Sequence, residues 1–552
     1  MSLFRKKTID SILRNKEAES HHDSLGKHLN VRDLTFFGIA AIIGAGSFSS
    51  IGSACFSGGP GIIFLFLICA VACGFTAMCY AEFSSRVPIS GSAYTYAYVS
   101  FGELFAWIIG WALLMEYSIG NIYVAFSWSG YFTNLLEGAG IHLPAWLTIN
   151  YSEAHMEALS NTPGEGLSAW TTAPQLGGLR IIFDLPAVCI NILITWLVYV
   201  GTKESRNVSN IMVWIKLAII ALVVLVGAFY INVDNWSPFV PNGFKGVMSS
   251  VAAVFFAYIG FDAVSTLAEE SKNPQRDLPR GMIYSLLICT VIFVILALVL
   301  TGMVSYSQLN VSDPLAEVFA MKGVKWMLFI VSIAAAVAMT SVILVFQMGQ
   351  PRIWMSMSRD GLLPKQFARI HPKYKTPGFS TIMTGLVVGL PLFFTNPKFV
   401  LDFTSIGTLF AFVLVCGGVL TLPRREKDTS GGRFHMPYIN ARYIMPLIVL
   451  LMFTLLFCFQ PDFIFDNCHI TAGNAASTIP TLVFFVLCVI MGILSFIKQL
   501  SLIPVLGLLS CCYLLTGMEA SNWAWFAGWL VIGLIIYFVY GRRHSKLASP
   551  NT

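Results

Sequence analysis

Long apolar runs separated by short polar segments make up most of the chain. A run of about 18 apolar residues is long enough to cross a bilayer as a helix. Fourteen such runs can be recognised, but the ninth is short and the pair around Lys498 is hard to count, so twelve to fourteen spans are expected. The pattern predicts an all-α polytopic membrane protein. The runs lie near residues 34–56, 60–84, 103–133, 181–200, 210–231, 247–268, 282–304, 326–349, 380–395, 399–422, 443–460, 479–497, 499–517 and 522–541.

Composition leads to the same class. Hydrophobic residues make up 56% of the chain and charged residues only 11%, whereas a soluble domain carries roughly 25% charge. A lipid bilayer accepts the apolar exterior that such a composition produces. The net charge of +6 does not suggest a nucleic-acid partner. The twelve cysteines show no spacing typical of a metal site, so we expect buried thiols and neither metal nor cofactor.

The distribution of lysine and arginine predicts the orientation of the chain. With the N-terminus placed in the cytoplasm, 28 of the 34 lysines and arginines fall in inside segments, five fall in outside segments, and Lys216 lies within a span. Inside segments of membrane proteins are enriched in these cations. We therefore expect a protein of the inner, or plasma, membrane with cytoplasmic tails at 1–32 and 542–552. The loop 134–179 has no lysine or arginine, which is typical of an external loop.

Two of the predicted spans are interrupted near their middle. The first contains Ile-Gly-Ala-Gly-Ser at 43–47, and the sixth contains Phe-Ala-Tyr-Ile-Gly-Phe-Asp at 256–262. A broken helix in a membrane leaves backbone groups that need partners, so it is tolerated where it lines a cavity. Breaks at matching places suggest two five-helix repeats of inverted topology. The alternative is that Gly44 and Gly46 only form a close-packing face.

Four stretches resemble a known family. Residues 255–281 (FFAYIGFDAVSTLAEESKNPQRDLPRG) look like the signature of the cationic amino acid transporter family, within the amino acid–polyamine–organocation superfamily. Residues 81–103, 113–120 and 349–377 are similar to further family motifs, in order and at the expected spacings. The resemblance covers about residues 30 to 425.

The resemblance implies a LeuT-type fold, a 5+5 inverted repeat whose first and sixth helices are broken, and transport by alternating access. It implies a ten-span core at 33–425. The segment 426–541 would then supply about four additional spans, which is typical of the longer family members.

The resemblance also implies a substrate site at the two breaks. Backbone N–H groups at a helix N-terminus suit a carboxylate, and freed carbonyl groups suit an ammonium group. Ser47, Ser49 and Ser50 depart from the aliphatic run common in the family; they could line a more polar pocket or bond back to the helix. Met339, if it faces the pocket, would restrict the substrate to neutral, small or medium side chains; otherwise it packs between spans. The expected binding residues are Ile43, Gly44, Ala45, Gly46, Ser47, Phe256, Ala257, Ile259, Gly260 and Met339.

Ionisable residues within spans are candidates for ion coupling, because burying charge in a membrane is costly. Lys216 lies in the fifth span and either snorkels to the interface or, as in proton-coupled relatives, loads and releases a proton. By the same resemblance, Thr340 and Ser341 would face it and supply oxygens. Glu116 and Asp262 are either second proton sites, attractors of a cationic side chain, or carboxyls that brace helices.

These observations predict a secondary active amino acid transporter that works by proton symport. The alternatives are a cationic amino acid or polyamine uniporter and an amino acid antiporter. An enzyme is not expected, because all nine histidines lie in predicted loops or tails and no HExxH or nucleophile-elbow motif occurs. Charged residues next to the sixth and eighth spans, including Glu269, Glu270, Arg352 and Arg359, are either solvated loop charges or ion pairs of an inner gate.

Overall fold

The computed structural model describes residues 5–8, 27–44, 46–160, 164–177, 179–311, 314–395, 397–423, 434–459, 475–518 and 520–548. The helices of the first half are α2 (Val31–Ile42), α3 (Ile51–Gly58), α4 (Ile62–Arg86), α5 (Ala93–Ser100), α6 (Glu103–Gly138), α7 (Tyr151–Ser160), α8 (Glu165–Thr172), α9 (Leu185–Val200), α10 (Thr202–Ala228), α11 (Gly243–Met248) and α12 (Val251–Tyr258). Those of the second half are α13 (Pro274–Met303), α14 (Pro314–Met321), α15 (Lys325–Arg359), α16 (Gly378–Gly389), α17 (Pro397–Thr421), α18 (Ile444–Phe459), α20 (Ala475–Lys498), α21 (Leu502–Thr516), α22 (Ala520–Ile536) and α23 (Arg542–His544).

Each of the fourteen predicted apolar runs contains a helix. Within the described residues, eight helical stretches are long and apolar enough to cross a membrane, and five shorter apolar helices accompany them. The prediction of a helical, multi-pass membrane protein is confirmed. Among the described residues, the strands are limited to a hairpin of two antiparallel two-residue strands, β1 (Gln175–Leu176) and β2 (Leu179–Arg180). Gly177, with φ of +58°, supplies the backbone conformation that this turn requires.

The first and sixth predicted spans are both broken where the sequence places glycine. In the first, α2 ends at Ile42, Ile43 is extended, and a π-helical turn η1 (Gly46–Ser50) leads into α3. In the sixth, α12 ends at Tyr258, and Gly260 has φ of +115°, a conformation that glycine adopts without strain. A 3₁₀-helix η5 (Phe261–Leu267) continues the chain.

Long helices surround the broken ones. α15 packs along α6, α6 packs along α17, and α13 packs against both α2 and α4. α10 packs against α2 and α15. The described part of the C-terminal region forms a chain of neighbours, in which α18 packs on α20, α20 on α21, and α21 on α17 and α4. The broken segments are therefore enclosed by helices from distant parts of the sequence.

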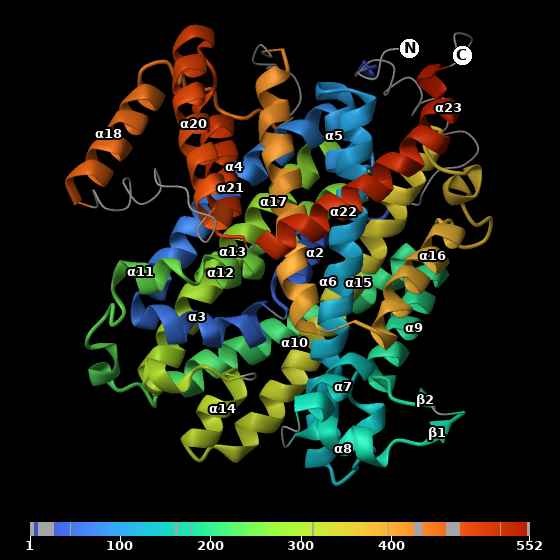
Figure 1. Ribbon diagram of the computed structural model, residues 1–552, viewed down its shortest axis with the longest axis vertical. Coiled ribbons are helices and arrows are strands. Elements are labelled where there is room, and N and C mark those ends of the chain that lie inside the picture. The colour runs from blue at the N-terminus through green and yellow to red at the C-terminus, as the bar shows by residue number, and fades with distance from the viewer. Residues whose placement is uncertain are drawn as a thin grey trace.

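The two ends of the bundle differ in structure. Figure 1 shows α7, α8 and the hairpin at one end and α23 at the other. α7 and α8 belong to the loop predicted to be external, and they have a small apolar core of their own. In that core Trp170 packs with Tyr151, and the guanidinium of Arg180 lies 4.9 Å from the Trp170 ring centroid. At the opposite end, Glu103 contacts both ends of the chain, because its backbone N–H donates to the Arg5 carbonyl and its carboxylate accepts a bond from the Ser545 hydroxyl just after α23. We call the surface formed by residues 5–8, 103, 360 and 542–546 the terminal face.

A pair of tryptophans holds α22 against α6. The Trp111 indole N–H donates to the Trp529 carbonyl at 2.9 Å, and the Trp529 indole N–H donates to the Trp111 carbonyl at 3.0 Å. The two rings stack with centroids 4.7 Å apart. Trp107 adds a third bond, to the Gly533 carbonyl at 2.8 Å. Buried indole N–H groups are thus satisfied while large apolar rings pack closely.

This contact leaves no room for a side chain at position 533. A methyl group on Gly533 would lie 2.6 Å from the Trp111 indole nitrogen, whereas one on Gly528 of the same helix would meet nothing within 4 Å. We expect Gly533→Ala to lower stability by about 1–3 kcal/mol through overpacking and Gly528→Ala to leave it unchanged or higher. The measurement is the thermal denaturation midpoint in detergent. Equal midpoints for the two variants would contradict this account of the contact.

Candidate functional site

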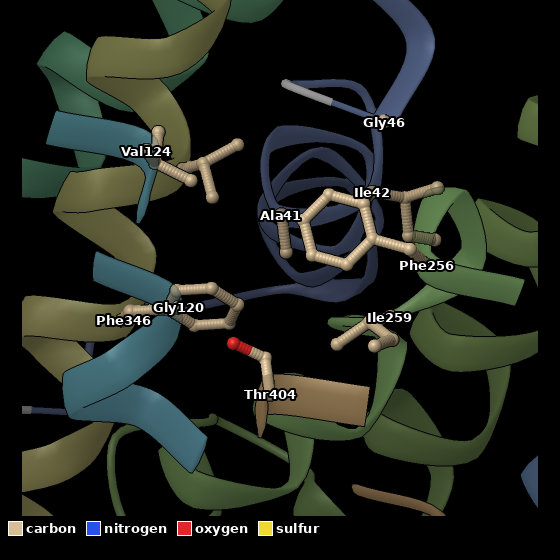
Figure 2. Close-up of a pocket in the computed structure, with 10 residues that line it drawn as sticks. Ala41, Ile42, Gly46, Gly120, Val124, Phe256, Ile259, Phe346 and Thr404 are labelled. Carbon is tan, nitrogen blue, oxygen red and sulfur yellow. The ribbon is translucent and has the colours of Figure 1, made fainter. Parts of the chain in front are cut away.

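A small cavity lies between the two broken helices. Figure 2 shows the rings of Phe256 and Phe346 on opposite sides of it, with the Thr404 hydroxyl directed toward it. That hydroxyl also donates to the Val400 carbonyl at 3.0 Å. The lining is mainly apolar. It comes from both broken spans and from α6, α15 and α17. It consists of Ala41, Ile42, Gly46, Gly120, Val124, Phe256, Ile259, Val342, Phe346 and Thr404.

Glycines bring the two breaks into contact. A methyl group on Gly46 would lie 2.5 Å from the Ala257 Cα, and one on Gly260 would lie 2.7 Å from the Ala41 Cβ. The backbone of each broken span therefore touches the other. Gly44 lies equally close to Val342 of α15. These glycines thus have both of the predicted roles, since they pack closely and shape a cavity.

The structure places the expected binding residues in two groups. Gly46, Phe256 and Ile259 line the cavity, whereas Gly44, Ala257 and Gly260 are not among the lining residues and pack against Val342, Gly46 and Ala41, respectively. Ala45 lies outside the described residues. Met339 is fully buried and is not among the lining residues.

The serines of the first break bond to the backbone. The Ser47 hydroxyl donates to the Gly44 carbonyl at 2.9 Å, and the Ser50 hydroxyl donates to the Gly46 carbonyl at 2.6 Å. Neither residue lines the cavity. Of the two readings of these serines, the structure favours the one in which they satisfy freed carbonyl groups.

Several lining residues were not singled out from the sequence. Gly120 and Val124 lie four and eight residues after Glu116, so they share one face of α6 with it. Val342 and Phe346 lie three and seven residues after Met339, so they share one face of α15 with it. Helical spacing from the two residues already identified could therefore have found four of them. Thr404 of α17 carried no such signal.

Lys216 of α10 lies beside the first break and is completely buried. Its ammonium group donates to the Ile43 carbonyl at 2.9 Å, and to the carbonyls of Ile39 at 3.1 Å and Ala40 at 3.2 Å. A fourth partner is the Ser341 hydroxyl of α15 at 2.9 Å. The carbonyl groups belong to the C-terminal end of α2, where the helix dipole favours a cation.

The neighbouring hydroxyl groups differ in their contacts. The Ser341 hydroxyl also lies 3.1 Å from the Ala40 carbonyl, so it links α15 to α2. The Thr340 hydroxyl instead donates to the Ala336 carbonyl of its own helix at 2.7 Å. Thr340 and Ser341 were both expected to supply an oxygen that accepts a bond from Lys216. Only the Ser341 hydroxyl does so. Lys216 does not snorkel, since its ammonium group is surrounded by protein.

Two carboxyl groups, of Glu116 and Asp262, are fully buried near the helices that line the cavity. The Tyr117 hydroxyl approaches one Asp262 oxygen at a long 3.4 Å, and the Tyr117 ring stacks on the lining residue Phe346. The other Asp262 oxygen and both Glu116 oxygens have no hydrogen-bond partner among the described residues. The two carboxyl groups are near enough to act on each other electrostatically. Thr408 of α17 can also approach Glu116 as a hydrogen-bond donor, so the role of Glu116 as a brace between helices stays a prediction.

Comparison with known proteins identifies the family of this chain. The family model described as amino acid permease matches residues 29–467. The chain belongs to the amino acid permease family. A second model, for the C-terminus of these permeases, matches residues 500–545.

Relatives of the permease cover its whole length. The branched-chain amino acid permease BcaP of Bacillus subtilis is 38% identical over 547 residues, or 99% of each chain. The methylthioribose transporter of the same organism is 36% identical over 547 residues, again 99% of each. The vacuolar cationic amino acid transporter 2 of Arabidopsis thaliana is 31% identical over 628 residues, 99% of this chain and 94% of that one. The resemblance to cationic amino acid transporters is confirmed, and the protein is a transporter and not an enzyme.

Ion pairs connect α15 to the segment that follows the sixth predicted span. Arg352 of α15 is buried and pairs with buried Glu270 at 2.5 Å, and Arg359 pairs with Glu269 at 2.9 Å. The Ser90 hydroxyl accepts a bond from the Glu269 backbone N–H at 3.0 Å. Charges adjacent to the sixth and eighth predicted spans are therefore paired with each other across the bundle, as an inner gate requires.

The contact between the breaks predicts a local requirement for glycine. Gly46→Ala would force Ala257 and its backbone away, because a methyl group cannot stay 2.5 Å from the Ala257 Cα. We expect this variant to lose amino acid binding by at least about tenfold, which corresponds to about 1.4 kcal/mol. Gly130→Ala on α6 is the matched control, since its methyl group meets nothing within 4 Å. Substrate-induced thermal stabilisation of purified protein measures binding; unchanged affinity in Gly46→Ala would contradict the role of this contact.

Proposed function

We propose that the permease is a secondary active transporter that takes up a neutral amino acid together with a proton by alternating access. The observation that carries this proposal is the Lys216 ammonium group, which bonds to the carbonyl of Ile43 at the edge of the substrate cavity. The same carbonyl is a candidate partner for the substrate ammonium. Ion and substrate would thus meet at one backbone group.

The geometry around Lys216 supports a coupling mechanism. A charged ammonium group has three N–H donors, and here four acceptors from α2 and α15 surround it. A neutral amine has one donor fewer and a lone pair that these carbonyls would repel. Loss of the proton would therefore weaken the tie between α2 and its neighbours and let α2 move. Ser341 provides the link to α15.

The cavity supports a substrate with an apolar side chain of small or medium size. Its lining residues include no acidic group, and its walls are formed by Phe256, Phe346, Val124 and Val342. A cationic side chain would be left without a partner there, which is costly. A relative named as a branched-chain amino acid permease fits this reading. Relatives named as cationic amino acid transporters keep the uniporter alternative open.

We also propose the architecture and location that this mechanism needs. The breaks in the first and sixth predicted spans support a LeuT-type inverted repeat over residues 33–425, followed by additional spans over 426–541. The distribution of lysine and arginine supports a plasma-membrane protein with both termini in the cytoplasm. The terminal face would then be cytoplasmic, and the paired charges of Arg352 and Arg359 would form the inner gate.

Glu116 and Asp262 are proposed as a second proton site. Both are fully buried, and three of their four oxygens have no hydrogen-bond partner among the described residues. Tyr117 connects Asp262 to the cavity wall at Phe346. A substrate in the cavity would therefore change the surroundings of this pair.

Replacing Lys216 tests the coupling directly. In proteoliposomes, an inward proton gradient of one pH unit supports about tenfold accumulation by a one-to-one symporter. We expect the wild type to accumulate a neutral amino acid, such as leucine, in response to the gradient. Lys216→Met should not accumulate it, because no group at this position cycles a proton. Lys216→Arg keeps a permanent charge and should also fail.

Solute counterflow provides the control, because it needs binding and alternating access but no proton gradient. Counterflow retained by Lys216→Met would show that the variant is folded. Gradient-driven accumulation retained by that variant would exclude Lys216 as the coupling residue. If the wild-type protein shows leucine counterflow but no leucine accumulation in response to the proton gradient, the antiporter or uniporter alternative would be favoured.

Narrowing the cavity tests the substrate class. A methyl group on Gly120 would lie 3.0 Å from the Phe346 ring and 3.7 Å from the Thr404 methyl group. We expect Gly120→Ala to reduce leucine uptake several-fold more than alanine uptake, while Gly130→Ala on the same helix changes neither. In wild type, leucine, isoleucine and valine should compete for uptake and arginine and lysine should not. Competition by arginine alone would point to the cationic alternative.

A further inference from the structure

Cationic residues from both ends of the chain meet on the terminal face. The Glu103 backbone N–H donates to the Arg5 carbonyl at 2.9 Å, so residues 5–8 lie along the start of α6. The Lys546 backbone N–H donates to the Asp360 carbonyl at 3.1 Å, so the end of the chain lies at the end of α15. In Figure 1, α23 and α5 lie toward the same end of the molecule. Segments more than five hundred residues apart thus share one surface.

The acidic groups of this surface are already satisfied. Glu103 is buried and accepts hydroxyl bonds from Ser545 at 2.6 Å, Tyr537 at 2.9 Å and Tyr98 at 3.0 Å. Three donors leave this carboxylate little capacity to attract a further cation.

Asp360 is satisfied in a similar way. It pairs with Lys7 and accepts a bond from the Tyr94 hydroxyl at 2.7 Å. Burial, reinforced by the nearby Asp360 charge, raises the pKa of Tyr94, so this phenol remains a donor. Both carboxylates are therefore committed to partners on the terminal face itself.

Four cations remain without an anionic partner among the described residues. Lys6, Arg543 and Lys546 are exposed and Arg542 is half-buried, and none of the four forms an ion pair there. Arg542 and Arg5 are both near enough to the Tyr537 hydroxyl to act on it electrostatically, which places the two ends of the chain side by side. We call Lys6, Arg542, Arg543 and Lys546 the basic patch.

The basic patch directly follows an apolar surface. Ile535, Phe538 and Val539 expose 57%, 42% and 64% of their surface, and they precede Arg542 by one to two helical turns. They belong to a 24-residue helical stretch, Ser521–His544, that is apolar enough to cross a membrane. In a bilayer such side chains contact acyl chains, and cations one turn further lie at the level of the phosphate groups.

We propose that the basic patch binds the headgroup of an anionic phospholipid, whose acyl chains lie against the exposed apolar residues of the last helix. The positive charge of the patch favours a headgroup with net negative charge. A zwitterionic headgroup has no net charge and would be attracted more weakly. The adjoining apolar surface favours a lipid over free phosphate, because a free anion would contact the basic patch but not the exposed apolar residues. Clusters of lysine and arginine next to a membrane helix attract anionic lipids in this way.

The site is connected to the transport machinery. Glu103 begins α6, which carries Gly120 of the cavity, and Asp360 follows α15, which carries Phe346. A lipid bound at Arg542 and Lys546 would hold the chain end that contacts both acidic residues. Anionic lipid should therefore change the transport rate as well as bind.

Direct lipid binding tests the proposal and does not depend on the transport mechanism. The full-length protein in detergent would be incubated with equal amounts of phosphatidylglycerol and phosphatidylcholine, and bound lipids counted by native mass spectrometry. Each cation near a charged lipid surface is worth about a fivefold change in affinity. We expect the triple variant Arg542→Gln, Arg543→Gln, Lys546→Gln to lose its preference for phosphatidylglycerol by at least about tenfold.

A charge-matched control separates a site from general electrostatics. Lys365→Gln, Arg369→Gln, Lys373→Gln removes three exposed cations from the loop between α15 and α16, and it should keep the wild-type preference. Equal loss in both variants, no preference in the wild type, or displacement of phosphatidylglycerol by equimolar inorganic phosphate would each overturn the proposal. In vesicles of phosphatidylcholine with and without three-tenths phosphatidylglycerol, uptake should respond to the anionic lipid in wild type and control only.

Discussion

The interaction on which the rest of this structure depends is the bond between a buried ammonium group and the end of a broken helix. In a bilayer, carbonyl groups freed by unwinding have no water to bond with, so a partner must come from the protein. Lys216 is that partner for Ile39, Ala40 and Ile43. The ammonium group in turn could not remain charged at this depth without several oxygens around it. The lysine satisfies the carbonyl groups that the helix break frees, and these carbonyl groups stabilise the buried charge of the lysine. Removal of the proton from Lys216 would weaken both interactions.

Close backbone contact determines the shape of the cavity. Gly46 lies against Ala257 and Gly260 against Ala41, so the two breaks face each other without intervening side chains. The space left between them is bounded by α6, α15 and α17, which supply mainly apolar groups. An amino acid held there would have its charged ends at freed backbone groups and its side chain against these helices. In the proposed mechanism, recognition of the charged ends and selection of the side chain would thus come from different parts of the fold.

The sequence predicted the features that depend on chain order and composition. The apolar runs and the two breaks follow from hydropathy and glycine placement, whereas the buried position of Lys216 and its contact with Ser341 followed only from the family resemblance. The lining residue Thr404 did not follow, because its position depends on how the whole of α17 is rotated against its neighbours. The same holds for Thr340, whose hydroxyl bonds within its own helix although it adjoins Ser341. The tryptophan contact between α6 and α22 joins residues 418 positions apart and left no local pattern.

Two long helices connect the middle of the molecule to its surface. α6 carries Glu116 and Gly120 at its centre, meets Trp529 of α22 through Trp111, and begins at Glu103 under the chain ends. α15 carries Ser341 beside Lys216 and ends next to Asp360, which holds the other chain end. Close-packed helices transmit displacement along their length more readily than they deform. Any movement that opens the cavity must therefore either carry the chain ends with it or break their bonds to Glu103 and Asp360. In the proposed mechanism, the terminal face would therefore move together with the helices that line the cavity.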